Sequence, residues 1–185
     1  ISMPPQFVYN HFTKERMIIV QNDNHKVFAI NSKGEESWSI QLNSKILGNI
    51  SSIDVYKNNK YQCLFNTESQ LYLIDRNGDH VDGFPKSLPS NTKIGHALFD
   101  YNKTKKYRII IIGEDNKIYN LDKKGKKVKG WKYEKDSNRI KQTPQYLRVG
   151  NKDYILAERN NSSTQLLAIN GSERVEFEEG TQFNG

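Results

Sequence analysis

The chain has 185 residues, of which 35% are hydrophobic and 26% charged, and its formal net charge is +7. This length suffices for one domain with a buried core. No run of 18 apolar residues occurs, which excludes a membrane-spanning helix from the sequence pattern. The single cysteine, Cys63, excludes an internal disulfide, and its apolar surroundings predict a buried, inert thiol.

The balance of residue types favours strands and tight turns over helices. The chain contains 18 Ile, 20 Asn and only 4 Ala. Ile suits pleated, half-buried surfaces, Ala suits helices, and Asn suits turns. The sequence also begins at Ile1 rather than at Met, and we interpret it as an excerpt of a longer protein.

Four consecutive units of four short strands each are predicted along the chain. Each unit has a short strand, a strongly apolar strand, an apolar strand that ends at a Gly turn, and a final strand. In chain order the predicted strands are 6–9, 17–20, 27–30 and 37–42; 50–55, 61–65, 71–74 and 80–85; 96–99, 107–112, 118–121 and 128–133; and 145–149, 154–157, 166–169 and 174–177.

The third strands align as an internal repeat. If Ile30, Ile74, Leu121 and Ile169 are equivalent, the successive spacings are 44, 47 and 48 residues, in the range of β-propeller blades. The last copy is shortened by two residues at its turn in this alignment. The predicted fold class is an all-β propeller of four-stranded antiparallel blades, in one domain with blades at about 1–45, 46–93, 94–141 and 142–185.

Two strand patterns predict burial. The second strand of each unit is apolar at consecutive positions, as in Ile109–Ile112, which predicts burial on both faces between neighbouring blades. The fourth strand alternates, as in Trp38, Ile40 and Leu42, which predicts an outer edge with one face exposed. The Asp-Arg-Asn-Gly and Asp-Lys-Lys-Gly segments predict tight turns with Gly in the left-handed conformation.

The segment from Val27 to Trp38 resembles the repeat of PQQ-like, or quinoprotein dehydrogenase-like, β-propellers. That repeat reads apolar-Tyr-Ala-Leu-Asp, a turn with Gly, and then Trp. The second copy departs from it, with Phe84-Pro85 at the Trp position, and the fourth has Phe177 there. The repeat positions are Asn31, Gly34, Trp38, Asp75, Gly78, Phe84, Asp122, Gly125, Trp131, Asn170 and Gly171.

The resemblance implies the non-enzymatic branch of that family. Its quinone-dependent enzymes have about eight blades and a calcium site, and no residue here matches their cofactor ligands. We therefore expect no cofactor, no metal and no catalytic residue, and we interpret Trp38 and Trp131 as residues that pack one blade on the next. An excerpt of a larger propeller is expected, with a closed four-blade ring or a solenoid as alternatives.

Other candidate chemistry is weak. None of His11, His25, His80 and His96 has metal-ligand spacing, so solvated or turn histidines are expected. The segment 75–79 has oxygen ligands at alternate positions, as in a calcium loop, but lacks the final bidentate Glu, which favours a plain β-turn.

Positive charge concentrates in the third of the four repeat units, the predicted third blade. Residues 101–141 hold 14 Lys and Arg against 5 Asp and Glu. A basic stretch attracts nucleic acid, but lysines also protect an edge strand from aggregation, and we favour the second interpretation. The candidate basic patch comprises Lys123, Lys124, Lys126, Lys127, Lys129 and Lys132.

These observations predict a non-catalytic binding or scaffold module with a protein or glycan partner bound at loops along one rim of the blades. By resemblance we expect the bacterial periplasm or cell envelope. Missing chain or oligomerisation is expected to complete the ring. The alternatives are part of a quinone-dependent or other propeller enzyme whose remaining blades are absent, and nucleic-acid binding through the basic third blade, which we expect least.

Overall fold

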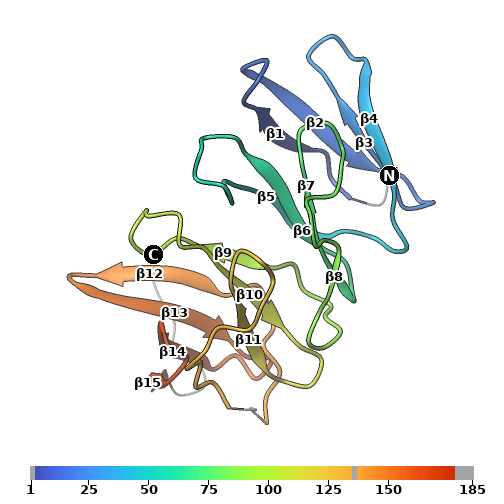
Figure 1. Ribbon diagram of the computed structural model, residues 1–185. Helices are drawn as coiled ribbons and strands as arrows, with labels where there is room; N and C mark the ends of the chain where they lie inside the picture. Colours follow the sequence, from blue (N-terminus) through green and yellow to red (C-terminus); the bar gives the residue numbers. More distant parts are fainter. Residues whose placement is uncertain (1–2, 135–136, 178–185) are drawn as a thin grey trace. The chain divides into compact units, whose positions relative to one another are not determined.

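The computed structural model describes residues 3–134 and 137–177, and all its regular elements in these ranges are strands (Figure 1). The strands form four antiparallel sheets, each a meander in chain order. The first sheet contains β1 (Gln6–Asn10), β2 (Glu15–Gln21), β3 (Lys26–Ile30) and β4 (Glu36–Gln41); the second contains β5 (Leu47–Ile53), β6 (Gln62–Asn66), β7 (Gln70–Ile74) and β8 (Lys86–Ser87). The third contains β9 (Ala97–Phe99), β10 (Arg108–Ile112) and β11 (Ile118–Leu121); the fourth contains β12 (Gln145–Val149), β13 (Lys152–Glu158), β14 (Thr164–Ala168) and β15 (Glu173–Phe177).

The chain divides into two compact units, 1–88 and 89–185, and each unit holds two sheets with their own core. In the first unit, Met17 and Ile19 of the first sheet pack in one cluster with Phe65 and Ile74 of the second. In the second unit the cluster joins the third and fourth sheets. Its buried strand residues are Ala97, Phe99, Ile110, Ile112, Ile118, Ile155, Ala157 and Leu167. No helix in the described part of the chain is long and apolar enough to cross a membrane.

The turn after the third strand has a local cause in the first three sheets. The carboxylate of Asp75 accepts hydrogen bonds from the backbone N–H groups of Asn77 and Asp79, at 2.8 and 3.0 Å. Asn31 and Asp122 make the same pair of bonds in the first and third sheets. A short side chain with an acceptor oxygen therefore selects this turn, as Asx turns do. The segment 75–79 is thus a β-turn, as its sequence favoured.

A tryptophan joins the sheets within each unit. Trp38 of the first sheet lies against Gly78 of the second, so that a Cβ at Gly78 would come within 2.9 Å of the indole side chain. Trp131, which follows the third sheet, lies against Gly171 in the same way, at 2.8 Å. Both glycines have positive φ, +91° and +84°. Only a residue without Cβ both adopts this conformation freely and admits the ring.

The predicted fourth strands are wrong in the two middle sheets. The second sheet makes a single bridge between Ile74 and His80 and then forms the two-residue β8, later than the predicted 80–85. In the third sheet, Lys127 makes one bridge to Leu121, and the described residues of 128–133 form no strand. Gly83 and Gly130, with φ of +78° and +80°, turn the chain away from the sheet at equivalent places. The lysines 127, 129 and 132 therefore do not protect an edge strand.

The predicted equivalence of Ile169 is also wrong. The turn is closed by a backbone hydrogen bond in which the Gly78 N–H donates to the Asp75 carbonyl in the second sheet, and the Gly171 N–H donates to the Ala168 carbonyl in the fourth. The turns therefore have equal length, and Leu167 is the residue equivalent to Ile74. Leu167 is fully buried, whereas Ile169 lies in the turn and is 43% exposed. The similarity of Asn170 to Asp75 favours an alignment of Ile169 with Ile74, which is two residues beyond the true equivalent, Leu167.

Burial of the second strands on both faces is confirmed only in the middle sheets. Every residue of β6 is buried, as are Ile109–Ile112 in β10. In β2 and β13, by contrast, buried residues alternate with half-buried ones. The end sheets thus use similarly apolar strands whose second face is only half-buried.

Candidate functional site

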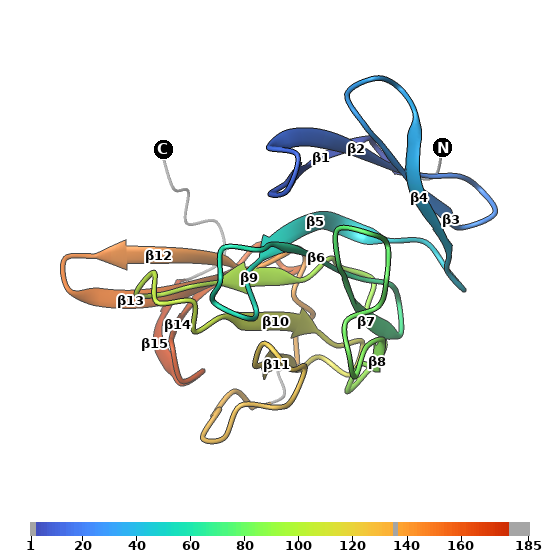
Figure 2. The same cartoon turned by 45° about the horizontal axis from the view of Figure 1, so that its top comes forward.

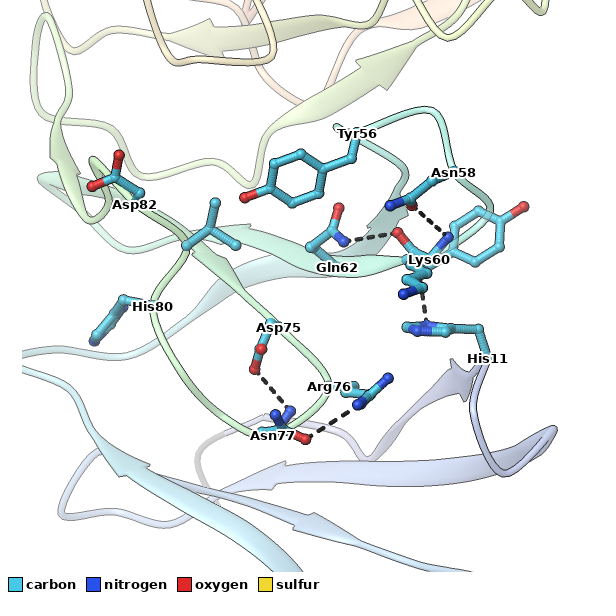
Figure 3. Close-up of a pocket in the computed structure, with 12 residues that line it drawn as sticks. His11, Tyr56, Asn58, Lys60, Gln62, Asp75, Arg76, Asn77, His80 and Asp82 are labelled. Carbon is cyan, nitrogen blue, oxygen red and sulfur yellow. Dashed lines mark hydrogen bonds between the residues drawn. The ribbon is translucent and has the colours of Figure 1, made fainter.

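The candidate site is a cleft of about 400 Å³ in the first unit, formed where hairpin turns meet (Figure 3). His11 comes from the β1–β2 turn, Tyr56 and Lys60 come from the β5–β6 turn, and Arg76 comes from the turn after β7. We call it the hairpin cleft. Its complete lining is His11, Tyr56, Asn58, Lys60, Tyr61, Gln62, Asp75, Arg76, Asn77, His80, Val81 and Asp82.

Buried side chains fix the turns that carry the cleft. Asp54 is fully buried, and its carboxylate accepts hydrogen bonds from the N–H groups of Asn58 and Asn59 at 3.0 and 2.8 Å. Gln62 accepts from the N–H of Val55 and donates to the carbonyl of Lys60. These bonds satisfy backbone groups of the β5–β6 turn and hold it in one conformation. The cleft therefore has a preformed wall.

His11 joins the two sheets at the floor of the cleft. Its Nδ1 accepts a hydrogen bond from the Tyr61 N–H at 3.1 Å, so the neutral ring carries its proton on Nε2. That Nε2 is buried and has no hydrogen-bond partner among the described residues. Burial first, and then the charges of Arg76 and Lys60, lower the pKa of His11, which keeps the ring neutral near pH 7. Nε2–H is thus an unused donor.

The cleft is electrically polarised. His11, Lys60 and Arg76 lie toward one end, and His80 and Asp82 lie toward the other (Figure 3). Arg76 also stacks over the exposed ring of Phe12, with 4.7 Å between guanidinium carbon and ring centre. The Arg76 Nε donates to the Asn77 side-chain oxygen at 3.4 Å, and the stacked guanidinium can present its terminal N–H groups to a carboxylate. The arrangement suits an acidic group at one end and a basic or polar group at the other.

No group of three or more His, Cys, Asp or Glu that could hold a metal ion occurs in the part of the chain that the structure describes. Burial raises the pKa of the Cys63 thiol to about 12, so it is protonated at neutral pH and is a poor nucleophile. The chemistry that the cleft supports best is hydrogen bonding and ion pairing.

The histidines differ from the prediction. His80 is exposed and His11 and His25 are half-buried, but His96 is buried, so the expectation of a solvated or turn histidine is wrong there. His96 directly precedes β9. Burial lowers its pKa to about 4.

The candidate basic patch lies in the second unit, around the turn after β11 and the segment beyond it. Lys124, Lys126, Lys129 and Lys132 are exposed, and Lys123 is half-buried. The ammonium of Lys127 lies 5.2 Å from the ring centre of Tyr119. The structure does not bring these lysines to the hairpin cleft, which belongs to the first unit. Nucleic-acid binding by this patch stays a prediction that nothing contradicts and nothing supports.

A second cavity, of about 190 Å³, lies beside β11 and includes Asn120, Lys127, Trp131 and Tyr133 in its lining. Asn120 is 2% exposed, and neither atom of its carboxamide has a hydrogen-bond partner among the described residues. Equivalent positions in the other sheets hold Ala29, Leu73 and Leu166. A polar residue at an otherwise apolar repeat position is a sequence signal that the repeat analysis did not use.

The remaining cleft residues were missed by sequence reasoning for a physical reason. His11, Lys60 and Arg76 are separated by up to 65 positions in the chain and form no motif. Only the packing of the first sheet on the second brings their turns together. The usable signal was general: polar residues in consecutive hairpin turns of a repeat gather on one rim.

Comparisons with known proteins support the fold. No protein-family model matches the sequence, and no curated protein matches it either. Among solved structures, the chain is similar to BamB from Moraxella catarrhalis, with a TM-score of 0.61 and 16% identity over 92% of this chain and 47% of that one.

Two further solved structures show the same likeness. BBS1N, solved in complex with ARL6DN, has a TM-score of 0.68 and 11% identity over 96% of this chain and 57% of that one. The V. cholerae biofilm matrix protein Bap1 has a TM-score of 0.64 and 11% identity over 94% and 28%. This chain thus spans about half of the length of BamB and of BBS1N, and a smaller share of Bap1. At such identities the likeness shows the fold alone, and that fold is the β-propeller.

Proposed function

We infer that the chain is a non-catalytic β-propeller binding module that holds an extended segment of a partner protein in the hairpin cleft. The observation that carries this proposal is the polarised lining of a preformed cleft, with Lys60 and Arg76 at one end. A partner segment with an acidic side chain at this end gains charge-assisted hydrogen bonds. The exposed ring of Tyr56 provides apolar contact area beside them.

Support from the comparisons is general. BBS1N was solved in complex with ARL6DN, so a propeller of this kind is seen with a protein bound. BamB and the biofilm matrix protein come from bacteria, as does the PQQ-like branch that the repeat resembles, and we place the chain in a bacterial envelope protein on this basis. A protein partner is favoured over a glycan because the two cations at one end of the cleft suit the carboxylate of an acidic side chain.

Selection from a random peptide display library tests this proposal. The immobilised chain is expected to enrich peptides that contain Asp or Glu next to an apolar residue. The double variant Lys60→Glu and Arg76→Glu should abolish this enrichment, because both cations at that end of the cleft are reversed.

A matched control separates the cleft from the chain's overall positive charge. Lys33→Glu with Lys124→Glu changes the net charge equally, at exposed turn positions of the first and third sheets. This control should select the same peptides as the unaltered chain. The proposal is overturned if the control loses enrichment as fully as the cleft variant, or if the unaltered chain enriches no acidic peptides.

A further inference from the structure

Each end sheet leaves one apolar face uncovered. In the first sheet, the face that carries Phe7 is bare, and Phe7 is 67% exposed. Directly opposite residues of antiparallel strands share a face, so Phe7, Ile18 and Ile30 form one row across β1, β2 and β3. We call this the preceding face of the first sheet. Its apolar residues are Phe7, Tyr9, Ile18, Val20, Phe28 and Ile30.

The fourth sheet leaves apolar side chains uncovered on the other side, although Ala168 and Thr164 on this face are buried. Leu156 lies opposite Leu166, which lies opposite Val175, and Leu147 lies opposite Tyr154. None of these five residues is buried, in contrast to Ile155 and Ala157 on the opposite face of β13. Figure 2 shows β12 and β13 as the long hairpin of this sheet. We call this the following face of the fourth sheet.

Contacts inside each unit show which faces fit together. In the first unit, Met17 and Ile19 on the following face of the first sheet pack on the preceding face of the second. In the second unit, the third sheet contacts the fourth in the same sense. The strand registers make Ile18, Val20, Phe28 and Ile30 equivalent to residues that are buried in the second sheet. Those second-sheet residues are Cys63, Phe65, Tyr72 and Ile74.

The turn glycines show the same difference between the first sheet and the sheets that follow another sheet. Gly78 and Gly171 are each covered by a tryptophan from the sheet before. Gly34 has the same conformation, with φ of +83°, yet a Cβ built on it meets no atom within 4 Å. The first sheet therefore has the turn that receives an aromatic ring from a preceding sheet, and nothing in its own unit fills it.

A glutamine on the following face of a sheet makes hydrogen bonds to the next sheet. Gln6 on the following face of the first sheet bonds to the next sheet, donating to the Gly48 carbonyl at 3.1 Å and accepting from the Ile50 N–H at 2.6 Å. The registers place Gln145 at the equivalent position of the fourth sheet, because Gln6 lies opposite Ile19 and Gln145 opposite Leu156. Gln145 is exposed. It is available to bond the first strand of a following sheet.

We propose that the following face of the fourth sheet docks on the preceding face of the first sheet of a second copy of this chain. Both halves of the contact lie on one chain, so a second copy supplies what each lacks, head to tail. Such a heterologous contact uses two different patches and differs from a two-fold contact between identical patches. The alignments with BamB and BBS1N cover 47% and 57% of those chains, so each of these propellers extends beyond the part that this chain matches.

Sedimentation velocity over a dilution series tests the proposal. The unaltered chain is expected to shift from one copy to assemblies of two or more as concentration rises. Phe7→Lys on the first sheet and Leu147→Lys on the fourth should each weaken association at least about tenfold, because a lysine would be desolvated in an apolar contact. Ile169→Lys is the matched control, since Ile169 is exposed in the same sheet but lies in a turn.

Mixing the two variants distinguishes the head-to-tail contact. Phe7→Lys keeps an intact fourth sheet, and Leu147→Lys keeps an intact first sheet, so the mixture should associate more strongly than either variant alone. Circular dichroism checks that each variant is folded. A single copy at all soluble concentrations of the unaltered chain would overturn the proposal. A mixture no stronger than its components would do the same.

Discussion

The middle and end sheets have similar sequences and different surroundings. The second strand of the second sheet, β6, is buried at every position, whereas β2 of the first sheet is buried only at alternate ones. Yet β2 contains the run Met17–Val20, which is as apolar as any part of β6. A run of consecutive apolar residues therefore indicates only that a strand can be buried on both faces. Whether it is covered depends on the sheets beside it.

The largest expected effect separates the two faces of one strand. Ile19→Ala should lower the free energy of unfolding by about 3 kcal/mol, because Ile19 is 1% exposed and its truncation leaves a cavity. Ile18→Ala should cost less than about 1 kcal/mol, because its half-buried side chain already contacts water. Urea denaturation at a concentration where the chain is a single copy measures both. Equal losses would mean that the bare face is covered within one chain.

Buried His96 should make the second unit acid-sensitive. Its folded pKa of about 4 lies below the ordinary value of 6.5, so the unfolded chain binds the proton more readily. Stability is then full above about pH 6.5 and falls as pH drops toward 4, by about 3 kcal/mol in total. His96→Gln should flatten this part of the pH profile. A steep profile in His96→Gln would refute the assignment.

Two glycine substitutions compare a covered turn with an open one. Gly171→Ala and Gly34→Ala both place a Cβ in a left-handed conformation, which costs about 1 kcal/mol. Only Gly171→Ala also displaces the Trp131 ring, since the new Cβ would lie 2.8 Å from it. Thermal unfolding of single copies should show an additional loss of about 1–2 kcal/mol for Gly171→Ala. Equal losses would show that the tryptophan contact contributes nothing.

The smallest effect is expected at Asn120, and it is a gain. Asn120→Leu removes a buried carboxamide without partners and installs the residue found at the equivalent positions 73 and 166. Stability should rise by about 1 kcal/mol, because the desolvation cost of the polar group disappears. Asn120→Ala is the size control and should gain less. A loss of stability in Asn120→Leu would indicate that the carboxamide is bonded in solution.

Most residues of the hairpin cleft could not be predicted from the sequence. The PQQ-like resemblance pointed to a propeller, and the neighbours support the propeller without confirming that branch. Hairpin turns were expected to carry the binding surface, but His11 and Arg76 could not be paired without knowing how the first sheet packs on the second. The fourth strands of the middle sheets failed because Gly83 and Gly130 turn the chain at points where alternation alone predicted a strand.

The sequence by itself determined the local structure: strands wherever apolar β-formers cluster, and turns where Asp or Asn precedes a glycine with positive φ. These choices depend on a residue's own backbone preferences and on partners within a few positions. Only the tertiary structure decided which face is covered, where His96 is buried and which turns form the hairpin cleft. Burial depends on surfaces supplied by distant segments, and alternating strands carry no record of which segments those are.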